Sequence, residues 1–364
     1  MPKKRADATP ASPDLFFTKE LAGEEPPSFA AMKRLYERAS DLFGFRPWQI
    51  LSESELVVTR DSKSGEPWYC SVMGSMGEVY SMQAYRGEEG LRLFRSIAAE
   101  DLTDPGEVLA SMHCLSVEFV PRKELKRQDR ELLAALGHPQ GRGLASPVFR
   151  VIRPGFHPWF VNAEEARTLA ECIRSVVVIC AAIANQKDVN FWDRADTYPI
   201  VARADGTEPR YNIDLIKPVL PAQPPVAPLN LPEVLLRPLR GRDYAVRGAM
   251  ELEYVFSGAA VGKANERAAC IAIALAVDAE TGIVHAPEAI DTSVPTAEAL
   301  ARVFLKAVQS NRAFPGEVRL RSQKHAASLG PLMESFGVTL RVANRLPAAE
   351  EARAHLLGFI GGKQ

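Results

Sequence analysis

A run of prolines divides this chain. Seven prolines fall between Pro218 and Pro238, within residues 217–240 (KPVLPAQPPVAPLNLPEVLLRPLR). Proline lacks an amide proton and fixes φ, so we expect neither a helix nor a central strand to persist there. We interpret residues 217–240 as a stiff, extended linker; a PxxP ligand for another protein is the alternative. The run therefore predicts two domains, which suits a length of 364 residues.

The composition is typical of folded domains with balanced charge. Hydrophobic residues make up 46% of the chain, charged residues 24%, and the formal net charge is -1. This apolar fraction excludes global disorder, and the balance excludes a protein that is basic throughout, such as a coat for DNA. The five cysteines contain no Cys-x-x-Cys pair. We therefore expect no disulfide framework, no zinc ribbon and a cytoplasmic location.

Two further segments bear on localisation. The apolar stretch at residues 175–184 (SVVVICAAIA) is shorter than the roughly 20 residues that a membrane span needs. We interpret it as part of a buried helix and expect no membrane partner. The basic start of the chain is followed by no apolar region, so we predict no secretory signal. Residues 1–26 are interpreted as a disordered, solvated tail.

Residues 27–216 alternate between helical periodicity and short strand-like runs separated by glycine turns. The pattern predicts an α+β domain with a largely antiparallel sheet. The clearest helix is residues 163–185, with Asn162 as its N-cap. The other predicted helices are residues 28–42, 87–99 and 122–136, and the strands are residues 48–51, 55–60, 68–73, 78–85, 113–120, 147–153, 198–203 and 210–216.

Residues 241–364 predict a second α/β domain with the element order β-β-β-α-β-α-β-α. Its second strand is a nearly continuous apolar run, as a central strand needs. The predicted strands are residues 249–256, 269–277, 283–290, 317–321 and 338–342, and the helices are residues 296–310, 324–336 and 348–357.

Short motifs add to that order. They are VDAETG at residues 277–282, Thr296-Ala297 at a helix start, PGEVR at residues 315–319 and FGV at residues 336–338. In this order they resemble the ribonuclease H-like superfamily, which includes integrases and transposases. The resemblance implies a ribonuclease H-like fold for the second domain. The whole chain also resembles bacterial proteins of uncharacterised function that pair two such α/β halves.

The resemblance implies carboxylates that hold two divalent metal ions, Mg²⁺ or Mn²⁺, across a phosphodiester. Glu251 or Glu253 takes the first position, and Glu350 or Glu351 the third. The second position, after the fourth strand, reads VRLRSQK and contains no acid. A cation there repels metal ions, so the resemblance implies the fold and argues against nuclease or strand-transfer activity.

Two interpretations of the acidic residues stay open. We favour Glu251 and Glu253 as solvent-facing positions of an alternating strand, and Asp278 as a turn residue. The alternative is a rearranged catalytic site made of Glu251, Glu253, Asp278 and Glu350, acting as a metal-dependent nuclease or phosphodiesterase.

The net charge conceals a basic stretch. Between Arg302 and Arg345 there are eight basic residues and two acidic ones, a local excess of +6. If they share a face, they attract phosphate or an acidic partner; the alternative is that they are scattered. The binding candidates are Arg319, Arg321, Lys324, Arg341 and Arg345.

An aromatic, proline-rich turn (PGFHPWF, residues 154–160) precedes the long helix. His157 and Trp159 are candidates for a binding loop, although we favour a hydrophobic staple that fixes the helix entry. No histidine or cysteine has the spacing of a metal site. Our hypothesis is a non-catalytic binding or scaffold protein with no cofactor, whose partner is a nucleic acid or an acidic protein.

Overall fold

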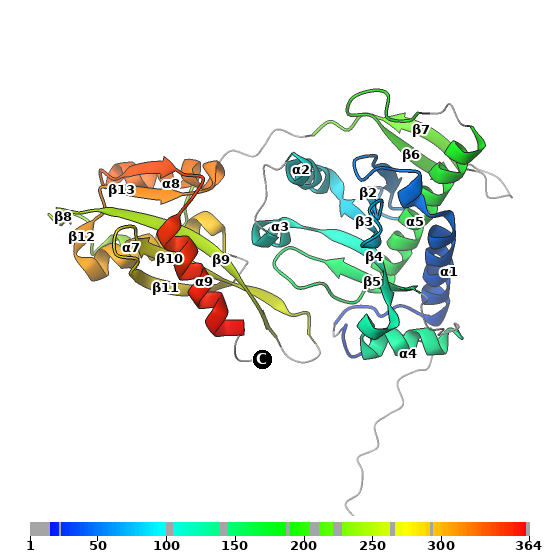
Figure 1. The fold of residues 1–364 in the computed structure, drawn as a ribbon, viewed down its shortest axis with the longest axis horizontal. Coiled ribbons are helices and arrows are strands. Elements are labelled where there is room, and N and C mark those ends of the chain that lie inside the picture. The colour runs from blue at the N-terminus through cyan, green and yellow to red at the C-terminus, as the bar shows by residue number, and fades with distance from the viewer. Residues whose placement is uncertain are drawn as a thin grey trace, which may run out of the picture. The chain divides into compact units, whose positions relative to one another are not determined.

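The computed structural model describes residues 15–21, 23–99, 105–137, 145–186, 190–203, 211–220, 228–262, 266–291 and 294–361. The chain separates into two compact units. The first comprises Met1–Pro221 with Gly262–Arg267, and the second comprises Ala222–Val261 with Ala268–Gln364. We call them the first and second domains (Figure 1).

The first domain contains a seven-stranded sheet in the order β5-β4-β3-β2-β1-β6-β7. All neighbours are antiparallel except β1 and β6, which are parallel. A single parallel pair therefore interrupts the largely antiparallel sheet. The strands are β1 (Val57–Arg60), β2 (Pro67–Met73), β3 (Tyr80–Arg86), β4 (Cys114–Pro121), β5 (Ala145–Ile152), β6 (Tyr198–Arg203) and β7 (Tyr211–Ile216).

Helices cover both faces of this sheet (Figure 1). The larger core lies under α1 and α5, and a smaller core lies under α2 and includes Tyr69, Tyr85 and Leu91. The helices are α1 (Phe29–Phe45), α2 (Gly87–Ala98), α3 (Pro105–Ser111), α4 (Arg127–Ala135) and α5 (Ala163–Asn185).

Helix α5 begins as its sequence predicts. Asn162 Oδ1 accepts a hydrogen bond from Glu165 N at 2.8 Å, and Glu165 Oε2 accepts one from Asn162 N at 2.9 Å. This reciprocal pair satisfies two N–H groups at the helix start. By length and composition alone α5 is able to cross a membrane. Half of its apolar window is buried, however, and residues such as Leu169, Ile173 and Val176 are fully buried in the core.

Four local features of the first domain differ from the sequence prediction, and the first is α3, a helix that the sequence does not predict. Residues 48–51 were expected as a strand, but Pro47–Gln49 form a 3-10 helix after Arg46, which adopts a left-handed φ of 50°. Residues 122–136 form a 3-10 turn and then α4, because Leu125 between them is extended. Within the expected tail, residues 15–21 pack on the domain, and the Phe17 ring stacks on Phe160 with centroids 4.6 Å apart. Residues 1–14 lie outside the described residues.

The second domain contains a five-stranded sheet in the order β11-β10-β9-β13-β14. Strand β10 pairs antiparallel with β9 and β11, while β13 pairs parallel with β9 and β14. A short parallel pair, β8 with β12, stands apart. The strands are β8 (Ala245–Val246), β9 (Ala249–Val261), β10 (Ala269–Asp278), β11 (Val284–Asp291), β12 (Ala313–Phe314), β13 (Glu317–Leu320) and β14 (Thr339–Val342).

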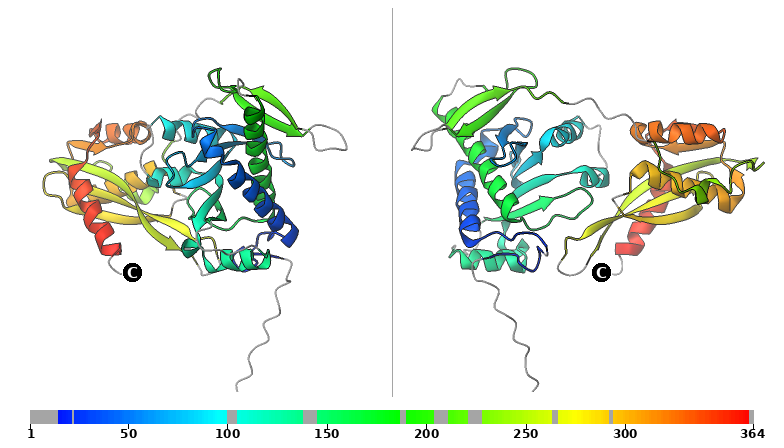
Figure 2. Two further views of the ribbon diagram at one scale, coloured as in Figure 1. Left: turned by 45° about the vertical axis from the view of Figure 1, so that its right-hand side comes forward. Right: turned by 180° about the vertical axis from the view of Figure 1, so that it is seen from behind.

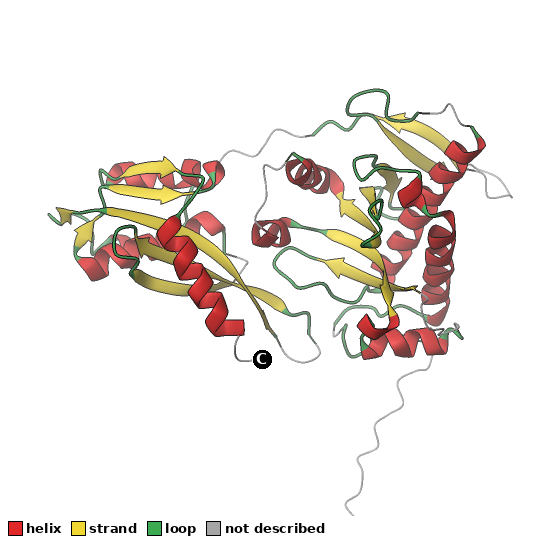
Figure 3. Ribbon diagram, in the orientation of Figure 1, coloured by secondary structure: helices red, strands yellow, loops and turns green. Residues whose placement is uncertain are grey.

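Helices cover both faces of this mixed sheet (Figure 3). Helices α7 (Thr296–Asn311) and α8 (Gln323–Ser335) pack on the face that carries the larger core of this domain. Helix α9 (Pro347–Gly361) packs on the opposite face, over β9 and β10. Helix α9 is in front in Figure 1, and α7 comes forward in the view from behind (Figure 2). The β-β-β-α-β-α-β-α order is therefore present, with β8 and β12 as additions.

Part of the proline run belongs to the second domain. Residues 221–227 lie outside the described residues. After them, Leu229, Leu231, Leu235 and Leu236 pack against the core of the second domain. Contrary to the expectation of no helix, Glu233–Leu236 form the short helix α6. Pro232 stands just before this helix, where its missing N–H costs nothing.

Candidate functional site

The two glutamates of β9 are buried. Glu251 is 1% exposed and Glu253 5% exposed, so the interpretation of solvent-facing positions is wrong. Their strand does alternate: Met250 and Leu252 face the core under α7 and α8, and Val255 belongs to the small core under α9. The glutamates share the Val255 face because side chains of a strand alternate. Helix α9 closes that face, which a pattern within the strand does not reveal.

Each buried carboxylate has hydrogen-bond donors. Glu251 Oε2 accepts from Ala349 N, in the first turn of α9, at 2.9 Å. A carboxylate at this position also meets the positive end of the helix dipole. Glu253 Oε1 accepts from Arg321 Nη1 at 2.9 Å and from Arg353 Nη1 at 3.1 Å. Such pairing is what a buried charge requires.

Arg321 joins two of the candidate acids. It directly follows β13, and its second nitrogen, Nη2, donates to Glu350 Oε1 at 3.1 Å. One guanidinium therefore bridges Glu253 of β9 and Glu350 of α9. The backbone N–H of Leu346, followed by Arg345 and Arg321, holds the pKa of Glu350 below its usual range. We call Glu251, Glu253, Arg321, Glu350 and Arg353 the arginine–carboxylate cluster.

Asp278 is not part of this cluster. It is paired in register with Met250, whose side chain faces α7 and α8, so alternation directs it to the face opposite Glu251. Asp278 Oδ1 accepts from Glu280 N at 3.0 Å and from the N and Oγ1 of Thr281, both at 2.8 Å. These hydrogen bonds close the turn between β10 and β11, which agrees with the interpretation of a turn residue.

The cluster does not fit a pair of divalent metal ions. Arg321 lies between the two acids that a metal ion would bridge, and a guanidinium cannot be deprotonated in a protein. Across the described residues, no three His, Cys, Asp or Glu side chains are grouped so as to hold a metal. The chemistry that this arrangement supports is therefore charge neutralisation, which fastens α9 to the sheet.

The predicted basic residues divide into paired and exposed members. Arg319 on β13 lies beside Arg341 on β14 and forms an ion pair with Glu317. Arg345 is 81% exposed and contacts Glu350 at 3.4 Å. Lys324 and Arg341 are exposed. At the start of the basic stretch, Arg302 pairs with Glu298 and Lys306 with Glu288, and these acids outside the stretch reduce its excess charge.

His157 and Trp159 lie in the loop between β5 and α5. Trp159 Nε1 donates to the carbonyl oxygen of Glu20 at 2.7 Å, and its backbone pairs with Val151. The Trp159 ring is half-buried and packs on the larger core, and His157 is also half-buried. These contacts favour the structural interpretation, in which the loop fixes the entry of α5.

Sequence reasoning missed Arg353. Its guanidinium supplies the second donor to Glu253, and it lies three residues after Glu350 on α9. Residues three apart are neighbours on a helix surface. That spacing is the only local signal that could have associated Arg353 with the candidate acids.

Comparisons with known families agree with the division into two domains. Residues 33–200 match the model of a domain of unknown function, DUF7309, and residues 235–357 match that of another domain of unknown function, DUF6930. No curated protein matches the chain. The family descriptions indicate no catalytic activity. The chain is therefore a two-domain protein in which a domain similar to the DUF7309 family precedes one similar to the DUF6930 family.

Proposed function

We propose that this protein acts by binding and that its second domain is a ribonuclease H-like scaffold without catalytic activity. The strand order β11-β10-β9-β13-β14, with three antiparallel strands followed by two parallel ones, supports this fold. The observation that carries the proposal is Arg321. It stands after the fourth strand of the core order, β13, and bridges Glu253 to Glu350.

A titration with Mn²⁺ and a cleavage assay test the absence of catalysis. We expect no saturable heat of Mn²⁺ binding and no cleavage of single- or double-stranded DNA or RNA. Metal-dependent cleavage that disappears in Glu253→Gln, with the fold retained, would support the rearranged nuclease site instead.

The binding surface of the proposal is a basic strip made of Arg319 on β13, Lys324 in the first turn of α8, Arg341 on β14 and Arg345 in the turn that follows β14. Its support is exposure: Arg341 and Lys324 are exposed, and Arg345 is 81% exposed. The carboxyl ends of parallel strands are also where ligands bind in open α/β sheets. Arg321 is left out of the strip because the arginine–carboxylate cluster uses it.

We propose a nucleic acid as the partner of the basic strip, in the cytoplasm. All five cysteines are free and buried, which suits a reducing compartment. Binding through four phosphate contacts gives a slope of about -3 for log K against log[salt]. Replacing Arg319 and Arg341 together by Glu should reduce the size of that slope by about 2.

Fluorescence anisotropy with labelled single-stranded DNA, duplex DNA and RNA measures this slope. Replacing Lys33 and Arg34 together by Glu, on the exposed side of α1 in the first domain, makes the same charge change outside the strip. Equal loss in both variants, or no salt-dependent binding, would overturn the nucleic-acid proposal. Binding of poly-glutamate in place of nucleic acid would identify an acidic protein as the partner.

A further inference from the structure

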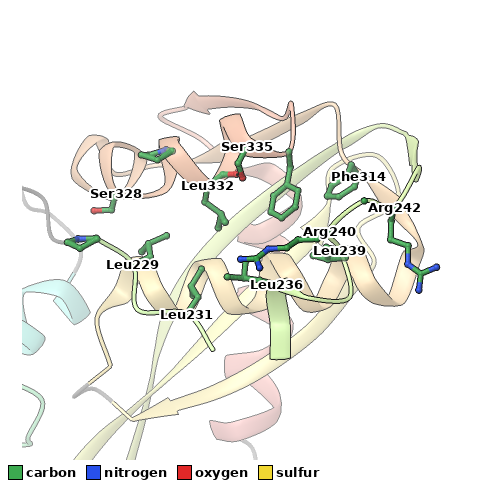
Figure 4. A pocket seen from close by; sticks show the side chains of 14 residues that line it. Leu229, Leu231, Leu236, Leu239, Arg240, Arg242, Phe314, Ser328, Leu332 and Ser335 are labelled. Atoms are coloured by element: carbon green, nitrogen blue, oxygen red, sulfur yellow. The ribbon is translucent and has the colours of Figure 1, made fainter. Parts of the chain in front are cut away.

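The second domain carries a groove that the basic strip does not include. It lies between residues 228–242 and α8 and has a volume of about 770 Å³ (Figure 4). Most of its lining is apolar. The side chains that define it are Leu229, Leu231, Leu236, Leu239, Phe314 and Leu332.

The base of the groove belongs to the packed core of the second domain. Leu239 is 2% exposed and Phe314 is 7% exposed. The Phe314 ring stacks on Phe336 with centroids 5.2 Å apart. The wall formed by residues 228–242 is fixed at α6, where the carbonyl oxygen of Leu235 accepts from Gln309 Nε2 of α7 at 2.8 Å. A preformed apolar surface of this kind does not have to be ordered when a ligand binds.

All charged residues that line the groove are basic. Arg240 and Arg242 are its charged residues, and no acid lines the groove. Arg240 pairs with Glu233 at 2.6 Å. Among the residues that the structure describes, Arg242 forms no ion pair, and its guanidinium extends away from the leucines at one end of the groove (Figure 4). An anionic group at that end gains an attraction that a neutral or cationic group lacks.

The volume decides between two kinds of occupant. Pockets for single small ligands measure about 300–1,000 Å³ and are mainly apolar with a few polar groups. A protein partner instead needs a surface that buries about 800 Å² on each side. A groove of about 770 Å³ with arginine at one end therefore suits one elongated small molecule.

We propose that this groove binds a long-chain organic carboxylate. The alkyl chain lies along Leu229, Leu231 and Leu332, and the carboxylate meets Arg242. This site shares no residue with the basic strip, so either proposal is able to fail without the other.

Calorimetry with sodium dodecanoate, below its critical micelle concentration, tests the site on the full chain. We expect one saturable site for dodecanoate and none for dodecyltrimethylammonium, which has the same chain length and the opposite charge. Arg242→Glu and Ser335→Glu each place a carboxylate at the groove. Each should weaken dodecanoate binding about tenfold, since attraction is replaced by repulsion.

Ser310→Glu is the matched control. Ser310 and Ser335 are both exposed and lie in the last turns of α7 and α8, but only Ser335 lines the groove. Both variants therefore oppose a helix dipole equally, and circular dichroism checks that both fold. Ser310→Glu should change the dissociation constant by less than about twofold. Absence of saturable dodecanoate binding, equal binding of the cationic amphiphile, or equal losses in the two serine variants would overturn the proposal.

Discussion

Each domain buries a carboxylate against an arginine of a packed helix or sheet, but the surroundings differ. In the first domain, Asp61 is 4% exposed. Its Oδ2 accepts from Arg167 Nη2 at 2.7 Å and from Thr168 Oγ1 at 2.6 Å. Its Oδ1 accepts from the backbone N–H groups of Lys63 and Ser64 at 2.9 and 2.8 Å. Burial alone raises the pKa of Asp61, yet these hydrogen bonds hold it well below its usual range.

The arginine–carboxylate cluster of the second domain is built differently. Asp61 is satisfied by its own turn and by one helix. Glu253 and Glu350, in contrast, lie on different elements and share Arg321 from a third. The buried acid of the first domain is therefore stabilised by its own turn and one neighbouring helix. In the second domain, the buried Glu253 is neutralised by arginines from two other elements, Arg321 after β13 and Arg353 on α9.

The largest expected effect is on Asp61, the buried acid of the first domain. Asp61→Ala leaves Thr168 Oγ1, two backbone N–H groups and Arg167 without their acceptor, which should cost about 3 kcal/mol of unfolding free energy. Urea unfolding followed by tryptophan fluorescence measures it, because Trp48, Trp68, Trp159 and Trp192 all belong to the first domain.

The control for this variant is Asp41→Ala. Asp41 pairs with Arg38 at 3.4 Å, and their side chains are 51% and 41% exposed. Exposed pairs contribute little, so the change should stay below about 0.5 kcal/mol. Similar losses in the two variants would show that the hydrogen bonds around Asp61 are not what stabilises the first domain.

The next effect tests the shared arginine. Arg321→Ala should destabilise the second domain by about 2 kcal/mol, less than a fully buried pair because the Arg321 side chain is 33% exposed. Far-UV circular dichroism should show an earlier transition, while the tryptophan midpoint stays unchanged. Arg345→Ala is the control, since Arg345 contacts the same Glu350 but is 81% exposed. If Arg345→Ala has the same effect, bridging is not the function of Arg321.

A third variant replaces the bridging arginine by an acid, so that the cluster is able to bind a metal ion. Arg321→Asp removes the bridging cation and places a third acid beside Glu253 and Glu350. We expect the variant to be less stable than the wild type in chelator, because like charges then face each other. Mn²⁺ at ten times its dissociation constant should restore about 1.4 kcal/mol. Thermal unfolding with and without Mn²⁺ measures this, and a metal effect of equal size on the wild type would contradict the bridging arrangement.

The sequence predicts these regions unequally. The order of elements in the second domain and the Asn162 cap follow from periodicity and local chemistry, which reside in neighbouring residues. The burial of Glu251 and Glu253 does not, because α9, about a hundred residues later, covers them. The alternation of apolar and acidic residues in β9 is the same whether the acidic face is exposed to solvent or covered by a helix. Likewise, the sequence shows that basic residues follow β13, but only the fold shows Arg321 between two acids.

The smallest effect compares one half-buried histidine in each domain, His113 and His325. Burial, followed by the charge of Arg86, lowers the pKa of His113 to about 4. Burial, followed by Lys324, lowers the pKa of His325 to about 4. The unfolded chain binds a proton near pH 6.5, whereas each folded domain resists it until about pH 4. The contribution of each neutral histidine to the free energy of unfolding is therefore fully present above pH 6.5. It is lost as the pH falls from 6.5 to 4, and it does not change further below pH 4.

Both histidines retain some exposure, so we expect a loss of about 1 kcal/mol in each domain across this window. Urea midpoints at pH 7, 5.5 and 4 measure it, with tryptophan fluorescence reporting the first domain and circular dichroism both. His113→Gln should flatten this part of the dependence only in the first domain, and His325→Gln only in the second. Each variant is thus the control for the other. A change of slope in both domains from either substitution would mean that the two domains do not unfold as separate units.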